Sequence, residues 1–229
     1  MAVKKILMLS KHEKTLRSKS EPVPKVNREL KALFKDLRDT MDDAGNAIGL
    51  AAPQIGVMKR VFAVRLGYKD AEQAENAIVA EGVEGKALEK GQTPERDSDV
   101  PREMPPAVIM VNPQIFERSA EVERASDGCL SIPGLMGYTN RNFRIHVKYL
   151  DEQGQPQDQW FEKWDARMIQ HEQDHLDGVL FMDRLTSFDD LFVVSRDDEG
   201  KLIQTPYKDV VNNAKQHASG ERRKPIFAR

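Results

Sequence analysis

The spacing of apolar residues predicts two helices. Between Asn27 and Gly45, leucine, phenylalanine and methionine recur every three or four positions, which is the pattern of a helix with one buried face. Asn27 can cap the start of this helix and Gly45 can end it. A second helix is expected from a cap at Asp165 to about Asp177, and Gly178 stands in the usual stop position.

Short runs of β-branched and aromatic residues predict several strands. The turn that contains Gly154 separates the last two of these runs. At the start of the chain, a short apolar stretch that ends at Leu9 favours a first strand. That opening stretch is too short for the core of a signal peptide. The strands are expected at 61–64, 108–111, 145–150 and 160–161, and near the N-terminus before Leu9.

Two segments differ in composition from the rest of the chain. Residues 67–105 hold ten acidic and five basic residues with little apolar periodicity, which indicates a solvated insertion with a short helix near 71–79. From residue 186 the chain is polar, with a turn expected at 197–200 and a basic end. We therefore expect one catalytic domain, residues 1–185, followed by a C-terminal extension, residues 186–229.

Charge and cysteine content exclude some classes of function. The chain of 229 residues has 35 basic and 37 acidic side chains, so its balance gives no reason to expect broad nucleic-acid or membrane binding. No apolar run is long enough to span a bilayer, so we expect no membrane insertion. The balanced charge gives no indication of specific DNA recognition, although a local patch could still bind nucleic acid or a membrane. Cys129 is the one cysteine, which excludes an intrachain disulfide and fits a reducing cytoplasm.

The strongest chemical signal is an HExxH sequence on the second predicted helix. His171 and His175 are four residues apart, so both imidazoles lie on one helical face and can reach one metal ion. Glu172 is offset around the helix and can take the proton of a metal-activated water. HExxH also arises by chance in unrelated sequences. A catalytic metal site of this kind needs a third protein ligand, so a suitable ligand elsewhere in the sequence would support the metal-site interpretation.

The choice of third ligand narrows to a cysteine. The metzincin pattern HExxHxxGxxH fails because Phe181 occupies its last position, and Glu199 lies in a predicted turn. Cys129, beside Gly128, is the remaining candidate. A lone cysteine is often a small core residue, but a thiolate partner for two histidines is the favoured interpretation here.

Three ordered motifs resemble those of the peptide deformylase family, over about residues 5 to 185. They are Ile48 to Gln54, Asp127 to Ser131, and Gln170 to His175. The resemblance implies an α+β fold in which largely antiparallel sheets surround the central helix that carries HExxH. It also implies that Cys129, His171 and His175 bind the metal, that Glu172 is the general acid and base, and that Gln54 and the Leu130 N–H stabilise the oxyanion.

The resemblance also suggests substrate contacts, each with an alternative. Ile48 and Leu130 are candidates to contact the methionine side chain, although core packing explains them equally well. Gly49 would let the substrate backbone lie close, or would serve a turn that needs positive φ. Gln54 would be odd as a core residue because its amide must be satisfied, but it is ordinary in a solvated loop.

The chain departs from the family pattern at three positions. Ala47 replaces the first glycine of the first motif, and Met136 stands where many relatives carry an arginine near the substrate. Asp127 replaces a glutamate that pairs with an arginine in the family, and Arg141 matches that arginine. We expect an Asp127–Arg141 pair that holds the ligand loop.

The function implied is metal-dependent removal of the N-formyl group from N-formylmethionyl nascent peptides, with release of formate. The alternatives are a metallopeptidase or general amidase, and a non-catalytic relative that binds through the pocket. The ligands accept Zn²⁺, Ni²⁺, Co²⁺ or Fe²⁺, and family behaviour implies Fe²⁺ in the cell. A ribosome contact through Arg222 to Lys224 is less favoured than a solvated terminus. The expected setting is cytoplasmic, or organellar if a transit peptide has been removed.

Overall fold

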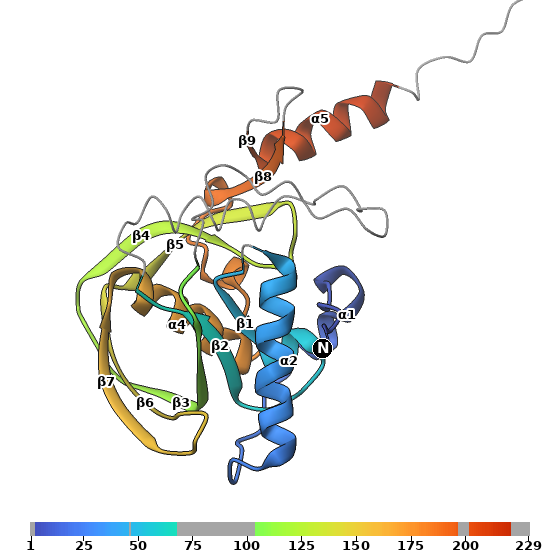
Figure 1. The fold of residues 1–229 in the computed structure, drawn as a ribbon. Helices are drawn as coiled ribbons and strands as arrows, with labels where there is room; N and C mark the ends of the chain where they lie inside the picture. The colour runs from blue at the N-terminus through green and yellow to red at the C-terminus, as the bar shows by residue number, and fades with distance from the viewer. Residues whose placement is uncertain (1–2, 46, 68–103, 197–201, 221–229) are drawn as a thin grey trace, which may run out of the picture.

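Two antiparallel sheets form the framework of the computed structural model, which describes residues 3–45, 47–67, 104–196 and 202–220 (Figure 1). The first sheet has the order β1-β2-β3-β6-β7 and the second has the order β4-β5-β8-β9. The first contains β1 (Gly49–Ala51), β2 (Val61–Arg65), β3 (Ala107–Arg118), β6 (Arg144–Leu150) and β7 (Pro156–Glu162). The second contains β4 (Val122–Gly128), β5 (Leu135–Asn142), β8 (Leu191–Arg196) and β9 (Leu202–Pro206).

The helices cover these sheets from different sides. Helix α4 (Lys163–Leu176) packs on β1, β2, β5, β6 and β7, between the two sheets, whereas α2 (Arg28–Ala44) covers the outer face of the first sheet (Figure 1). The others are α1 (Leu9–Leu16), α5 (Tyr207–Gly220) and the 3₁₀ turns Ala52–Ile55, Phe181–Arg184 and Phe188–Asp190. The predicted α+β class with antiparallel sheets is confirmed.

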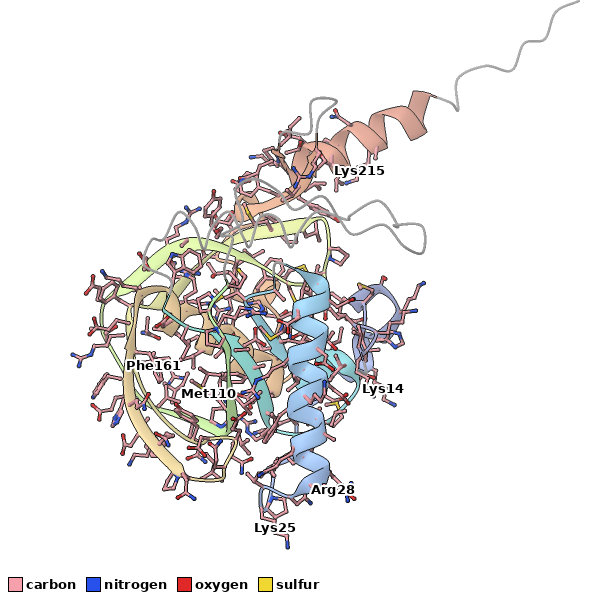
Figure 2. All side chains as sticks on the ribbon, viewed as in Figure 1. Lys14, Lys25, Arg28, Met110, Phe161 and Lys215 are labelled. Carbon is pink, nitrogen blue, oxygen red and sulfur yellow. The ribbon has the colours of Figure 1, made fainter. Side chains whose placement is uncertain are left out.

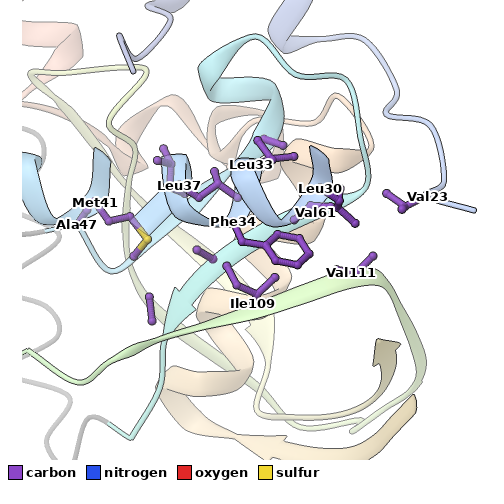
Figure 3. Packing of buried hydrophobic residues seen from close by; sticks show 14 residues of the cluster. Val23, Leu30, Leu33, Phe34, Leu37, Met41, Ala47, Val61, Ile109 and Val111 are labelled. Carbon is purple, nitrogen blue, oxygen red and sulfur yellow. The ribbon is translucent and has the colours of Figure 1, made fainter. Parts of the chain in front are cut away.

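At β2 the first sheet is buried on both faces, because successive side chains of this strand point to opposite sides and both sides are covered. Val61 and Ala63 pack with α2, whereas Phe62 and Val64 pack with α4. The predicted apolar face of α2 fills the outer layer with Leu30, Leu33, Phe34, Leu37 and Met41 (Figure 3). Met110 lies inside the protein, while Lys14, Lys25, Arg28 and Lys215 reach the surface (Figure 2). The sheet therefore gives α4 a rigid apolar support.

The predicted ends of α2 are confirmed. The Asn27 side chain accepts a hydrogen bond from the Leu30 N–H at 2.9 Å, which satisfies one of the free donors in the first turn. Gly45 ends the helix with φ 80°, a conformation that favours glycine. The strands expected within 61–64, 108–111, 145–150 and 160–161, and the turn at Gly154, are also present.

Two expectations about secondary structure are wrong. Residues 3–8 form no strand. The Leu7 N–H bonds to the Gln54 carbonyl in the 3₁₀ turn Ala52–Ile55, the Leu9 N–H bonds to the Ser131 carbonyl in a loop, and helix α1 begins at Leu9. Asp165 does not cap α4, because β7 continues directly into that helix and Glu162 is its N-cap. Asp165 instead accepts the Gly67 N–H at 2.9 Å.

The segment after residue 186 contributes to the second sheet, because β8 pairs with β5 from Leu135↔Val193 to Gly137↔Leu191. Helix α5 then projects away from the sheets (Figure 1). The turn predicted at 197–200, the helix predicted at 71–79 and Arg222 to Lys224 lie outside the described residues. Among the helices of the described ranges, none is long and apolar enough to cross a membrane.

Candidate metal centre

Three potential ligands converge where α4 meets the loop after β4. Cys129, His171 and His175 each offer one ligand atom, and these atoms lie within 4.8 Å of one another. The Cys129 Sγ is 3.3 Å from His175 Nε2. His171 and His175 are one helical turn apart, and Cys129 follows the last residue of β4, so the second sheet delivers the thiol to the helix.

Asp127 orients the first histidine. Its Oδ1 lies 2.7 Å from His171 Nδ1, which leaves Nε2 of that ring for the centre. The same carboxylate is fully buried and accepts hydrogen bonds from Thr139 Oγ1 at 2.9 Å and from Arg141 Nε at 2.8 Å. Carboxylate–histidine contacts of this kind fix the tautomer and the ring orientation of a metal ligand.

The charges around these side chains shift their titration. Burial would raise the pKa of Asp127, but the charges of Arg141 and His171 outweigh it and hold that pKa well below its usual range. Burial would lower the pKa of His171, but Asp127 raises it well above the ordinary value. For His175, burial and the neighbouring His171 both lower the pKa, which favours the neutral imidazole that ligates metals.

The Glu172 side chain is buried beside the three candidate metal ligands, and one of its carboxylate oxygens lacks a hydrogen-bond partner in the described chain. Burial, which disfavours the carboxylate form, raises its pKa to about 7. Within the described chain its Oε2 has no hydrogen-bond partner. A Cβ built on Gly49 would lie 2.1 Å from Glu172 Oε1, so Gly49 makes room for this carboxylate. Gly49 has no positive φ, and the alternative of a special turn does not apply.

Gln54 is buried and directs its amide towards the same centre. Its Oε1 accepts the Ala51 N–H at 2.8 Å, which fixes the amide orientation. Its Nε2 lies 3.2 Å from Ser131 Oγ and 3.5 Å from Cys129 Sγ. The alternative of a solvated loop residue is excluded, because the side chain is 2% exposed.

A small cavity of about 10 Å³ lies against these side chains. Met168 lines it but was missed in the sequence, although it precedes His171 by one helical step of three residues on the same face. Met136 does not line it and packs beside Val194 in the second sheet. The lining residues are Ile48, Gly49, Gln54, Gly128, Cys129, Leu130, Met168, His171 and Glu172.

The donor set suits a divalent transition-metal ion. A thiolate and two imidazoles supply three protein ligands, and such sites keep a fourth position for water or substrate. The buried Glu172 carboxylate beside them has one oxygen without a partner in the described chain, as expected of a group that serves a bound water. Fold and site together define a class of protein: a metal-dependent hydrolase built on antiparallel sheets around one helix.

Comparison with known proteins identifies the family within this class. The family model described as "Polypeptide deformylase" matches residues 3–190. A peptide deformylase of Synechocystis sp. is 38% identical over 76% of this chain and 75% of that protein. One of Rhizorhabdus wittichii is 37% identical over 79% of this chain and 86% of that protein. The chain belongs to the polypeptide deformylase family, whose members are metal-dependent and remove the N-formyl group from new polypeptides.

Solved structures agree with this assignment. The peptide deformylase of Ehrlichia chaffeensis superposes with a TM-score of 0.63 at 28% identity, covering 95% of this chain and 99% of that one. The enzyme of Synechococcus elongatus, solved in complex with actinonin, gives a TM-score of 0.60 at 30% identity, covering 80% of this chain and 79% of that one.

Proposed function

We propose that Cys129, His171 and His175 hold the metal ion with which this chain removes the formyl group of N-formylmethionyl peptides. The observation that carries the proposal is the buried Glu172 carboxylate beside these three side chains, with its Oε2 lacking a partner in the described chain. His171, Glu172 and His175 sit on α4, which is enclosed by both sheets, and Cys129 reaches them from the loop after β4. Little water competes for the reacting groups in such an enclosed position.

In the proposed mechanism Glu172 moves the proton. The metal ion, when bound, supplies Lewis-acid chemistry and lowers the pKa of water. Glu172 takes a proton from the attacking water as the new C–O bond forms. It then passes the proton to the departing amine as the formyl C–N bond breaks. The products are formate and a free N-terminal methionine. A pKa of about 7 suits both the uptake and the release of that proton.

Gln54 and Leu130 are proposed to stabilise the negative oxygen that develops on the formyl group. The bond from the Ala51 N–H holds the Gln54 amide in one orientation, with its N–H₂ group turned towards Cys129. Leu130 lines the same cavity and would contribute its backbone N–H. Fixed donors of this kind stabilise a tetrahedral intermediate without reorganising during the reaction.

The substrate would bind against the cavity wall. Ile48 and Leu130, joined by Met168 of α4, offer apolar contacts for the methionine side chain. Gly49 leaves space beside Glu172, which would also let the substrate backbone approach. The Asp127–Arg141 pair is proposed to hold the ligand loop by keeping β4 and β5 in register around the centre.

The metal and the cellular setting belong to the same proposal. Ferrous iron is proposed as the ion in the cell, in a cytoplasmic setting, while Zn²⁺, Ni²⁺ and Co²⁺ fit the same donors. Nascent formylated peptides are the proposed partners.

The test is formate release by anaerobically purified, Fe²⁺-loaded protein. Formyl-Met, acetyl-Met and unblocked tripeptides of the same sequence are compared. The proposal predicts rapid release from the formyl peptide with no cleavage of the others. Cleavage of the unblocked peptide would favour a metallopeptidase, and metal binding without any turnover would favour a binding protein.

A further inference from the structure

β3 is longer than the strand that pairs with it on one side. β2 pairs with β3 from Arg65↔Ala107 to Val61↔Val111, whereas β3 continues to Arg118 and pairs with β6 on its other side. In the part of the chain that the structure describes, no strand pairs with residues 114–118 on the side of β2. The main-chain groups there that face away from β6 form a free strand edge.

A groove of about 520 Å³ lies along this edge and shares no residue with the cavity at the candidate metal centre. β3 lines it with Gln114 to Phe116 and Arg118, and Phe116 is 53% exposed. Opposite β3, Lys19 lies before α2, Arg60 lies before β2, and Asp177 follows α4. The groove thus combines a strand edge, an exposed aromatic ring and several charges.

The charges in the groove are unbalanced. Lys19, Arg60 and Arg118 line it, and among the lining residues of the described ranges only Asp177 is acidic. Asp177 is engaged by Arg60, whose Nη1 lies 2.7 Å from its Oδ1. Its carboxylate therefore offsets only part of the positive charge, and the groove as a whole attracts anionic groups.

We propose that this groove binds an extended acidic segment of a partner polypeptide, which adds to β3 as a further strand. The free edge at 114–118 supplies main-chain donors and acceptors, Phe116 contacts an apolar side chain, and Lys19 and Arg118 pair with carboxylates. Strand addition draws affinity from the main chain and specificity from alternate side chains. β3 has a bulge between Ile115 and Glu117. The bulge interrupts regular pairing, so the added strand would pair with β3 over only a few residues.

The test uses a fluorescent alternating Glu-Val peptide of about eight residues, long enough for one strand. Comparison peptides are its Lys-Val counterpart and a Glu-Val peptide N-methylated at every amide, which cannot donate main-chain hydrogen bonds from either edge. Binding is followed by anisotropy, and amide hydrogen exchange is measured across β3. The proposal predicts that only the unmethylated acidic peptide binds and that exchange at 114–118 slows.

A matched pair of variants tests the charges. Lys19→Glu with Arg118→Glu should weaken binding at least about 10-fold. Lys14→Glu with Lys31→Glu, which reverses exposed charges on α1 and α2, should leave it unchanged. Deformylation should stay normal in both, which shows that the variants fold. Equal binding of the N-methylated peptide, unchanged exchange at 114–118, stronger binding of inorganic phosphate or polyuridylate, or self-association through the groove would each overturn the proposal.

Discussion

Gly49 and Glu172 face one another so closely that a single methyl group on Gly49 would overlap the glutamate. A Cβ placed on Gly49 would lie 2.1 Å from Glu172 Oε1 and 2.7 Å from Glu172 Cδ. Gly49 belongs to β1, at the edge of the first sheet, and Glu172 belongs to α4. The first and third sequence motifs therefore meet at one atomic contact.

Gly49→Ala should displace the Glu172 carboxylate and lower kcat by about 10- to 100-fold, because small misplacements of a reacting group are costly. The metal content should remain that of the wild type, since the three candidate ligands are untouched. Formate release and metal analysis on the same preparation check both points. A wild-type kcat in this variant would show that catalysis does not depend on the position of the Glu172 carboxylate.

Asp127→Asn should destabilise the protein and weaken metal retention together. The change leaves Arg141 buried with less compensation and removes the carboxylate that orients His171, so we expect a loss of about 3 kcal/mol in the free energy of unfolding. Urea unfolding and Co²⁺ titration, followed by the thiolate-to-cobalt absorption band, measure the two effects.

Ser126→Ala in the preceding residue is the matched control, because the buried Ser126 hydroxyl has no hydrogen-bond partner in the described chain. It should leave both quantities near wild type. Unchanged stability and cobalt affinity in Asp127→Asn would contradict the role given to the Asp127–Arg141 pair.

The Arg17–Asp183 ion pair predicts a pH-dependent part of the stability. Burial would raise the pKa of Asp183, but hydrogen bonds from Arg17 and from the Leu180 N–H outweigh it and lower that pKa below 3.8. A lowered carboxyl pKa stabilises the fold above the unfolded value, and this contribution is lost as the pH falls through the folded value. At neutral pH, Asp183→Asn should cost about 1 kcal/mol, because solvent screens this partly exposed pair.

The measurement for this pair is urea unfolding of both proteins at neutral pH and well below pH 3.8. The difference in unfolding free energy should shrink towards zero in acid. If the difference in unfolding free energy between the two proteins stays constant with pH, the Asp183 side chain stabilises the fold through packing and not through its charge. Asparagine keeps an acceptor for the Leu180 N–H, which Asp183 Oδ2 accepts at 2.9 Å.

The sequence predicted the elements whose signals are local. The buried face of α2, its Asn27 cap and the HExxH spacing each depend on residues close together in the chain. The candidate ligand Cys129 was reached by excluding Phe181 and Glu199 and was then supported by the family resemblance, because nothing local distinguishes a ligand thiol from a core thiol.

Side-chain contacts between segments far apart in the chain could not be predicted from the sequence. Arg167, buried in α4, donates to Thr139 Oγ1 at 3.0 Å, and Thr139 in turn donates to Asp127. No periodicity marks these two residues, because Arg167 on α4 finds its partners on β4 and β5, and Thr139 on β5 finds its partners on β4 and α4. The strand predicted before Leu9 is wrong for the same reason: the Leu7 and Leu9 N–H groups find single acceptors in a 3₁₀ turn and a loop that lie far away in the sequence, and no local pattern reveals them.

Glu172→Gln tests whether Glu172 moves the proton in a metal site made by Cys129, His171 and His175. The metal content and the kcat for a formyl-Met peptide are measured on one anaerobic, Fe²⁺-loaded preparation. We expect full metal occupancy with kcat reduced by about 10²- to 10⁴-fold. Full occupancy with near wild-type kcat would contradict this expectation, because the proton would then be moved by another group.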